Sequence, residues 1–221
     1  MARPGAFGAA LAVLAGAGVA VLLAAGLPCR SCMSAETAAR HGLLAHHRRL
    51  DGNVAPGALL FLGSSSIQGL AVGDVAERAV NLGVGGETIA LLAERLPHYL
   101  SLAAARGAVL AIGYNDLGGS EPEAALERYA ALLAALPSDL PLLLSGVQPG
   151  LLSPARERGA RFNAGLAALC ARRPRCSFVD LASALGGGEH YEADGIHLSP
   201  TGYAAWKRML AQTLERGGLA R

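Results

Sequence analysis

The feature that most constrains this chain is an alternation between short apolar runs and longer stretches whose apolar residues repeat with helical spacing. A short run without polar alternation is typical of a strand that is buried on both faces of a sheet. The apolar runs cover residues 58–62, 78–81, 108–112, 142–144 and 177–180. The helical stretches cover residues 36–50, 88–102, 121–136, 154–171 and 200–214. This alternation predicts an α/β fold with a parallel sheet and helices on both of its sides.

The N-terminal segment is a separate feature, because residues 6–27 contain no charged side chain. At ~1.5 Å per residue, a helix of this length can cross a hydrocarbon core of ~30 Å. Arg3 precedes the segment, as in a secretory signal, but the best cleavage site, Ala24-Ala25-Gly26, is weak. We therefore expect residues 1–33 to be a signal anchor or signal peptide with its juncture, and residues 34–221 to be one domain. The alternative is a buried helix of that domain.

The charge balance excludes one class of partner. The sequence has 19 Lys+Arg and 17 Asp+Glu, a formal net charge of +2, and no basic run that could follow a phosphate backbone. Nucleic acid is therefore not an expected partner. Hydrophobic residues make up 52% of the chain and charged residues 16%, so disorder is excluded over most of its length.

The four cysteines are an even set, which suits disulfides in an oxidising compartment. Cys170 and Cys176 could join the end of a helix to the next strand. Cys29-x-x-Cys32 follows the apolar segment and not a strand, which disfavours a redox motif, and Cys29 lacks the small residues that precede a lipidated cysteine. The cysteines and the apolar segment together predict that the protein is extracytoplasmic, either periplasmic or secreted. Anchoring of the protein to the inner membrane is one option.

Hydroxyl groups follow the first predicted strand. Gly63-Ser64-Ser65-Ser66 places them at a strand-to-helix turn, where backbone N–H groups are free to face a ligand. A serine in this turn is a candidate nucleophile. Capping of the helix by Ser64 or Ser66 is the structural alternative.

Two further strand ends carry candidate hydrogen-bond donors. Gly83-Val84-Gly85-Gly86 can bring backbone N–H groups close to a substrate oxygen, and its spacing differs from the dinucleotide-binding fingerprint. After the third strand, Asn115 offers a side-chain amide to a developing oxyanion, although an Asn-Asp pair is also common in turns and caps.

Asp194 and His197 stand three residues apart, just before the last helical stretch. That spacing lets the carboxylate hold the imidazole in one tautomer while its other nitrogen faces a serine. His190 is a rival base in the same region. Each of these signals is weak alone. Together they occur in the order Ser, Gly, Asn, Asp-x-x-His, each at the end of a predicted strand or at the entry to the last helix, and this combination favours a catalytic site.

These segments resemble the four blocks of the SGNH hydrolases, also called GDSL-like lipases and esterases. The resemblance implies Ser65 as nucleophile, Asp194 as orienter and His197 as general base. It also implies an oxyanion hole made of the N–H groups of Ser65 and Gly86 and the side chain of Asn115. Many relatives have Asp where Ser64 stands, so any structural help from that carboxylate is missing here.

The resemblance extends over residues 58–210 and implies a three-layer α/β/α sandwich with a five-stranded parallel sheet, flavodoxin-like in form. It implies no cofactor and no metal. The expected activity is hydrolysis of short-chain carboxylic esters through an acyl-enzyme, with O-acetyl groups on a carbohydrate as the favoured substrate. The alternatives are an O-acyltransferase, a lysophospholipase or thioesterase, and a non-catalytic glycan-binding protein. Gly63-x-Ser65-x-Ile67 lacks the second glycine of the other common nucleophile turn.

Overall fold

The computed structural model describes residues 34–150 and 153–220. The chain divides into two compact units, residues 1–46 and 47–221. The described part of the first unit is the beginning of helix α2 (Ala35–Asp51), which matches the helix predicted for residues 36–50. The apolar segment 6–27, Cys29 and Cys32 lie outside the described residues. Within the described ranges, no helix combines the length and apolar character that crossing a membrane requires.

The second unit is built on a sheet of five parallel strands, as the sequence predicted. The strands are β1 (Leu59–Gly63), β2 (Ala79–Gly83), β3 (Gly107–Ala111), β4 (Leu142–Ser145) and β5 (Cys176–Val179). Their order across the sheet is β2-β1-β3-β4-β5, and every neighbouring pair is parallel. The carboxyl ends of all five strands therefore lie at one edge of the sheet, which is where parallel sheets of this kind bind ligands.

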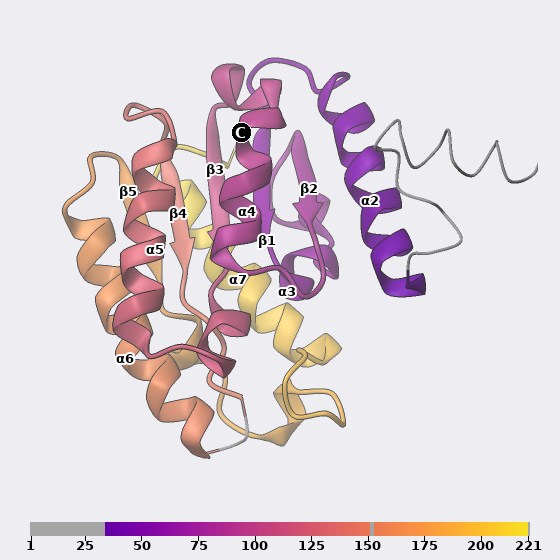
Figure 1. Ribbon diagram of the computed structural model, residues 1–221. Helices are drawn as coiled ribbons and strands as arrows, with labels where there is room; N and C mark the ends of the chain where they lie inside the picture. The colour runs from indigo at the N-terminus through magenta and orange to yellow at the C-terminus, as the bar shows by residue number, and fades with distance from the viewer. Residues whose placement is uncertain (1–33, 151–152, 221) are drawn as a thin grey trace, which may run out of the picture. The chain divides into compact units, whose positions relative to one another are not determined.

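Helices cover both faces of this sheet, which gives three layers. One face carries α4 (Ile89–Arg95), α5 (Pro122–Ala135) and α6 (Ser153–Ala171). The other face carries the short α3 (Ser65–Gln68) and the long α7 (Pro200–Arg216). Figure 1 shows α4, α5 and α6 on the near side of the strands and α7 behind them. The predicted α/β/α sandwich is therefore confirmed.

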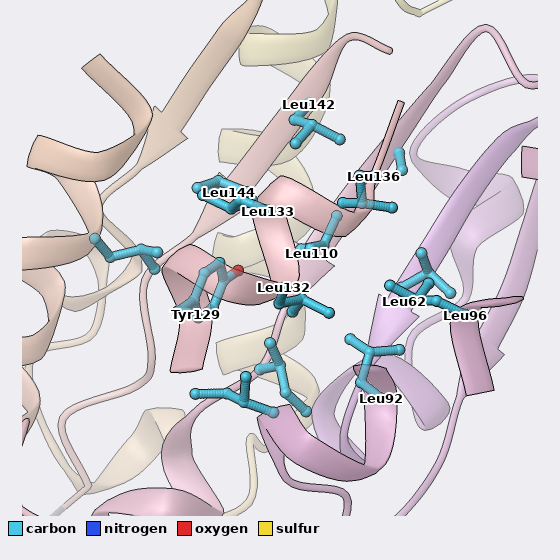
Figure 2. Packing of buried hydrophobic residues seen from close by; sticks show 14 of the residues in the cluster. Leu62, Leu92, Leu96, Leu110, Tyr129, Leu132, Leu133, Leu136, Leu142 and Leu144 are labelled. Carbon is cyan, nitrogen blue, oxygen red and sulfur yellow. The ribbon is translucent and has the colours of Figure 1, made fainter. Parts of the chain in front are cut away.

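The strands are apolar throughout because each of their faces packs against a helical layer. Figure 2 looks into the layer beneath α4–α6, where Leu92, Tyr129 and Leu132 lie in one buried cluster with Leu62 and Leu110 from the sheet. Full burial of each large aliphatic side chain contributes about 1.5–3 kcal/mol. This core makes the strand ends a rigid platform for the loops that follow them.

On the opposite face, Trp206 attaches α7 to the sheet. Its side chain is completely buried, in one core cluster with Phe61 and Val109. Its indole N–H donates to the hydroxyl of Ser145, at the end of β4, over 3.0 Å. Because α7 begins three residues after His197, this attachment also fixes the place of the loop that carries the histidine.

The helix predicted for residues 88–102 is wrong in its length. Thr88 caps α4, whose last residue is Arg95, and 3₁₀ turns follow at Leu96–His98 and Leu100–Ala104. Pro97 explains the break, because a proline ring clashes with the preceding turn of a helix and cannot supply its N–H. The apolar spacing continues through the turns, since they pack against the same core.

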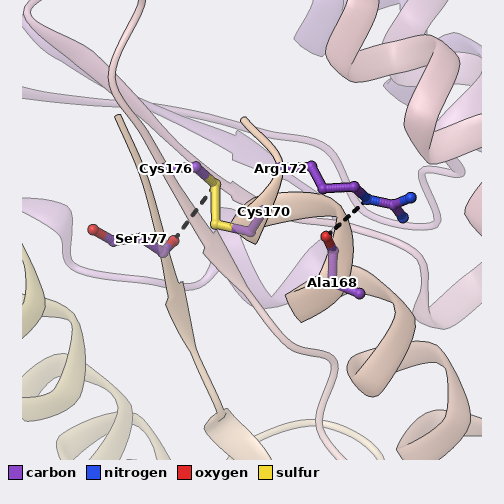
Figure 3. The surroundings of a disulfide bond; sticks show 5 residues. All are labelled: Ala168, Cys170, Arg172, Cys176 and Ser177. Atoms are coloured by element: carbon purple, nitrogen blue, oxygen red, sulfur yellow. Dashed lines mark hydrogen bonds between the residues drawn. A yellow bond between two sulfur atoms is a disulfide. The ribbon is translucent and has the colours of Figure 1, made fainter. Parts of the chain in front are cut away.

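A disulfide joins Cys170, in the last turn of α6, to Cys176, the first residue of β5 (Figure 3). The Cα atoms of the two cysteines are 5.4 Å apart. This is the pairing that the sequence suggested, and it closes the short connection between the helix and the edge strand.

Candidate active site

The serine turn follows β1 directly. Gly63 ends the strand so close to β3 that an added Cβ would lie 2.1 Å from the carbonyl oxygen of Ala111, so no larger residue fits. Ser65 is the first residue of α3, and a first-turn N–H has no acceptor within its own helix. The side chains of Ser64 and Ser66 are buried, whereas Ser65 is partly exposed. The turn therefore presents Ser65 and turns its two neighbours inward.

Ser65 meets the histidine that the sequence selected. The Nε2 atom of His197 lies 3.1 Å from the hydroxyl oxygen of Ser65, across a separation of 132 residues. The rival base, His190, makes no such contact with Ser65 in the described structure, and its Nδ1 atom lies 3.2 Å from the carboxylate of Glu189. Of the two histidines, only His197 is placed to exchange a proton with the serine.

Asp194 holds the other side of the imidazole. One of its oxygens lies 2.6 Å from Nδ1 of His197, and the other accepts the backbone N–H groups of Ile196 and His197 at 2.8 and 2.9 Å. The histidine contact and these two N–H groups lower the pKa of the Asp194 carboxyl to about 2. The carboxylate is therefore ionised at neutral pH, and its acceptor position fixes the Nδ1–H tautomer of His197.

The loop that carries this pair is a small hairpin. Tyr191 and Leu198 form an antiparallel bridge, and the N–H of Glu192 donates to the carbonyl oxygen of His197 over 2.8 Å. Gly195 has φ +68°, a conformation that favours glycine, at the tip of the turn. Asp194 and His197 are thus held by backbone hydrogen bonds before any substrate is present.

The glycine-rich loop after β2 is bonded to the serine turn. The N–H of Gly85 donates to the side-chain oxygen of Gln68, in α3, over 2.5 Å, and the N–H of Glu87 donates to Val84 over 3.2 Å. Gly86, between them, has φ +69°. Across the described part of the chain, no acceptor is found for the Gly86 N–H, so this donor is available to a ligand.

Asn115 lies in a 3₁₀ turn, Tyr114–Gly118, that follows β3. Its side-chain amide donates to the carbonyl oxygen of Glu87 over 2.8 Å, which places it beside the glycine-rich loop. The next residue, Asp116, accepts the N–H of Ile89 at 3.1 Å and so connects the same turn to the start of α4. One hydrogen of the Asn115 amide is used in this way, and the second is left for a ligand.

Two side chains that the sequence analysis did not single out connect the serine turn to other segments, one to α7 and one to the histidine loop. The hydroxyl of Tyr203, in α7, donates to the carbonyl oxygen of Ser66 over 3.1 Å. The side-chain nitrogen of Gln148 lies 3.4 Å from both the Ser66 hydroxyl and the carbonyl oxygen of Ile196. Gln148 stands in no motif, and Tyr203 ends the segment 194–203 with no pattern of its own, so only the three-dimensional arrangement could find their contacts.

Beneath the serine turn is a small cavity. Ser64, Ser66, Gln148 and Trp206 contribute to its lining, and its volume is about 10 Å³. This is the space of a single water molecule. The cavity therefore cannot receive a long apolar chain.

One group of potential metal ligands occurs within the described ranges. Glu192, Asp194 and His197 bring their side-chain ligand atoms within 4.8 Å of one another, and all three are partly or fully exposed. The Nδ1 atom of His197 already faces Asp194, so a metal ion would compete with the hydrogen bond that orients the imidazole.

Taken together, a serine faces an imidazole that a carboxylate orients, at the strand-end edge of an α/β/α sandwich. This is the geometry of a serine hydrolase site. Residues 62–205 match the model of the GDSL-like lipase/acylhydrolase family, and the chain belongs to this family. Comparison with curated proteins finds no match.

Several solved structures share the fold. A Streptococcus pneumoniae protein whose name refers to platelet activating factor has a TM-score of 0.69 and 23% identity, covering 80% of this chain and 91% of its own. A GDSL-like lipase from Bacteroides thetaiotaomicron has a TM-score of 0.67 and 17% identity, covering 78% and 97%. An acetylxylan esterase from Geobacillus stearothermophilus has a TM-score of 0.61 and 16% identity, covering 72% and 95%.

Proposed function

We propose that this protein hydrolyses short-chain carboxylic esters through an acyl-enzyme on Ser65. The observation that carries the proposal is the continuous contact from the Ser65 hydroxyl through both ring nitrogens of His197 to Asp194. Family membership supports acyl-ester chemistry in general.

In the first step, the Ser65 oxygen attacks the ester carbonyl carbon while Nε2 of His197 accepts the serine proton. The imidazolium that forms is stabilised by the ionised Asp194, which keeps its negative charge throughout. The low pKa of Asp194 supports this role, since the carboxylate does not take up the proton itself.

The negative charge that develops on the carbonyl oxygen needs hydrogen-bond donors. We assign them to the backbone N–H groups of Ser65 and Gly86 and to the free hydrogen of the Asn115 amide. Such preset donors stabilise the tetrahedral intermediate more than the ground state, because they are aimed at charge that appears only during reaction.

The intermediate then collapses. The bond between the carbonyl carbon and the alcohol oxygen breaks, and the alcohol leaves with the proton from His197. Water attacks the acyl-Ser65 ester in the same way, His197 takes its proton, and the carboxylic acid is released as Ser65 regains its hydrogen.

The favoured substrate is an O-acetyl group on a carbohydrate. The similar fold of an acetylxylan esterase supports the same substrate class. Activity on long-chain esters would instead favour a lysophospholipase or thioesterase.

The test is an assay of purified protein with a chromogenic acetate ester, then with esters of increasing acyl length and with acetylated oligosaccharides. Adding a free sugar acceptor separates hydrolysis from acyl transfer, because a transferase forms sugar ester faster than free acetate. Ser65→Ala should lose activity. Equal activity of the wild type and Ser65→Ala would overturn the proposal, and an inactive but folded wild type would favour a glycan-binding role.

We further propose that the domain functions outside the cytoplasm, anchored or released through residues 1–33. The uncharged segment 6–27 and the Cys170–Cys176 disulfide support this location. A topology reporter fused after Arg221 should be active only on the outer side of the inner membrane. A reporter that is active only in the cytoplasm would contradict it.

A further inference from the structure

A buried ion pair lies behind the glycine-rich loop. The Glu87 side chain is fully buried and Arg95 is 6% exposed. The guanidinium donates to both carboxylate oxygens of Glu87, with a distance of 2.7 Å for the Nε bond. It also donates to the carbonyl oxygen of Leu82 over 2.8 Å and to the hydroxyl of Tyr99. Every side of the pair is therefore occupied by protein groups.

Burying such an ion pair in the core has a large free-energy cost. Removing two charges from water costs several kcal/mol for each ion, and apolar residues of similar volume often stabilise a fold as well or better. The contacts of Glu87 indicate a role for the pair. The Glu87 side chain binds Arg95, whereas the Glu87 backbone carbonyl binds Asn115.

The backbone of Glu87 bonds to two parts of the structure that hold proposed oxyanion donors. Its carbonyl oxygen accepts the Asn115 amide at 2.8 Å, and its N–H closes the turn that contains Gly86. Gly86 itself has no side chain with which to hold its position. A fixed Glu87 side chain therefore restrains both the neighbouring Gly86 peptide and the direction of the Asn115 amide.

We propose that Glu87 and Arg95 are positioning residues that set the oxyanion donors of Gly86 and Asn115. This inference rests on the proposed function for its catalytic consequence. Arg95 anchors the Glu87 carboxylate to α4 and to the end of β2, and the Glu87 carbonyl sets the amide plane of Asn115. Neither side chain touches the substrate.

The experiment changes both partners together, because a single substitution leaves one buried charge unpaired and threatens folding. Glu87→Gln with Arg95→Met keeps the side-chain volumes similar and removes both charges. Leu133→Ala is the matched control: Leu133 is buried in the same core cluster but lies in α5 and has no bond to the loop. Unfolding measurements establish that both proteins are folded under the assay conditions.

The pair variant should lower kcat by about ten- to hundred-fold, because a small misplacement of the donors weakens transition-state binding. KM should change by less than about threefold, since the ground-state ester makes less use of these donors. Affinity for an alkyl boronic acid, which forms a tetrahedral adduct on serine, should fall by the same factor as kcat/KM. Leu133→Ala should keep kcat near the wild-type value.

A second experiment tests whether the loss of kcat in the pair variant arises through the oxyanion donors. In an Asn115→Ala background, the pair variant should cost much less than it does in the wild type, because one of the two positioned donors is already gone. Full additivity would overturn the inference, as would a loss of kcat in Leu133→Ala equal to that in the pair variant. Either result would reduce the ion pair to an ordinary core contact.

Hydrogen exchange separates failure of this inference from failure of the proposed function. Backbone amides of residues 84–88 should exchange faster in the pair variant and not in Leu133→Ala, whether or not the protein hydrolyses esters. Faster exchange with an inactive wild type would refute the esterase proposal alone. Unchanged exchange in the pair variant would refute the positioning role.

Discussion

The side-chain amide of Asn115 donates to the backbone carbonyl of Glu87 over 2.8 Å. This bond joins the turn after β3 to the loop after β2, two loops that flank the serine turn because β1 lies between β2 and β3 in the sheet. The strand order therefore brings the proposed oxyanion donors to either side of the nucleophile.

Removal of the Asn115 amide gives the most direct test of the proposed oxyanion hole. Asn115→Ala should lower kcat by roughly 10² to 10³, or about 3–4 kcal/mol of transition-state stabilisation, with a small change in KM. Steady-state kinetics on an acetate ester provide the measurement. A rise in KM with an unchanged kcat would show that Asn115 binds the substrate and does not act on the transition state.

The register of the nucleophile can be checked within three consecutive serines. An organophosphonate should label Ser65, and mass spectrometry of the labelled peptide should locate the adduct there. Ser64→Ala and Ser66→Ala should retain most activity, because their side chains are buried and turned away from the site. An adduct on Ser66 would contradict the assignment.

Gln68 offers a test of the loop that needs no change in the core, since its side chain is exposed. Gln68→Ala removes the acceptor of the Gly85 N–H and should lower kcat by about tenfold through a looser Gly86 donor. Gln68→Glu retains an acceptor oxygen and should recover most of that loss. Equal kcat values for the Ala variant and the wild type would show that the bond is not needed.

Asp116 predicts a pH-dependent contribution to stability. Burial raises the pKa of its carboxyl, against the opposing effects of the Ile89 N–H and Arg128. Because the pKa of Asp116 is higher in the folded state, the folded protein binds more protons than the unfolded chain at pH values above the usual carboxyl pKa. The contribution of Asp116 to the free energy of unfolding therefore falls as pH rises. Relative to Asp116→Asn, the wild-type free energy of unfolding should therefore fall from about pH 4 upward. Denaturant titrations at several pH values measure this difference, and a rising difference would contradict the prediction.

Tyr129 carries a hydroxyl that is fully buried and has no hydrogen-bond partner among the described residues. Burial without a partner raises its pKa strongly and costs stability. Tyr129→Phe retains the ring that packs edge-on against Phe162 and should stabilise the protein by about 1 kcal/mol. Thermal and denaturant unfolding test the change. A destabilised Phe variant would reveal a partner, such as a buried water, for the hydroxyl.

Much of the fold could be predicted because the strands are apolar on both faces and the helices have regular spacing. The helix expected at residues 88–102 was too long because its apolar residues keep their spacing through the turns after Pro97. The spacing reports which residues face the core, whereas Pro97 decides where helical hydrogen bonds end. For this segment the two signals disagreed, and the proline was the stronger.

Candidate site residues were selected from the sequence where they form short local patterns, as with Ser65 and the Asp194–His197 pair. The supporting residues were not. Glu87 and Arg95 are charged, and charged residues are ordinarily exposed, so their burial as a pair gives no signal in a single sequence. Gln148 and Tyr203 act through bonds to distant segments, and only the strand order determines which segments meet.

The separation of 132 positions between Ser65 and His197 also has a consequence for the timing of biosynthesis. At roughly 5–20 residues per second, translation needs on the order of 10 s to pass from the serine to the histidine. A growing chain therefore carries Ser65 without its proposed base, His197, until the segment before α7 has been made and folded onto the sheet. Under the proposed function, the appearance of esterase activity during synthesis should thus mark the completion of the domain, and an assay of that activity would report on its folding.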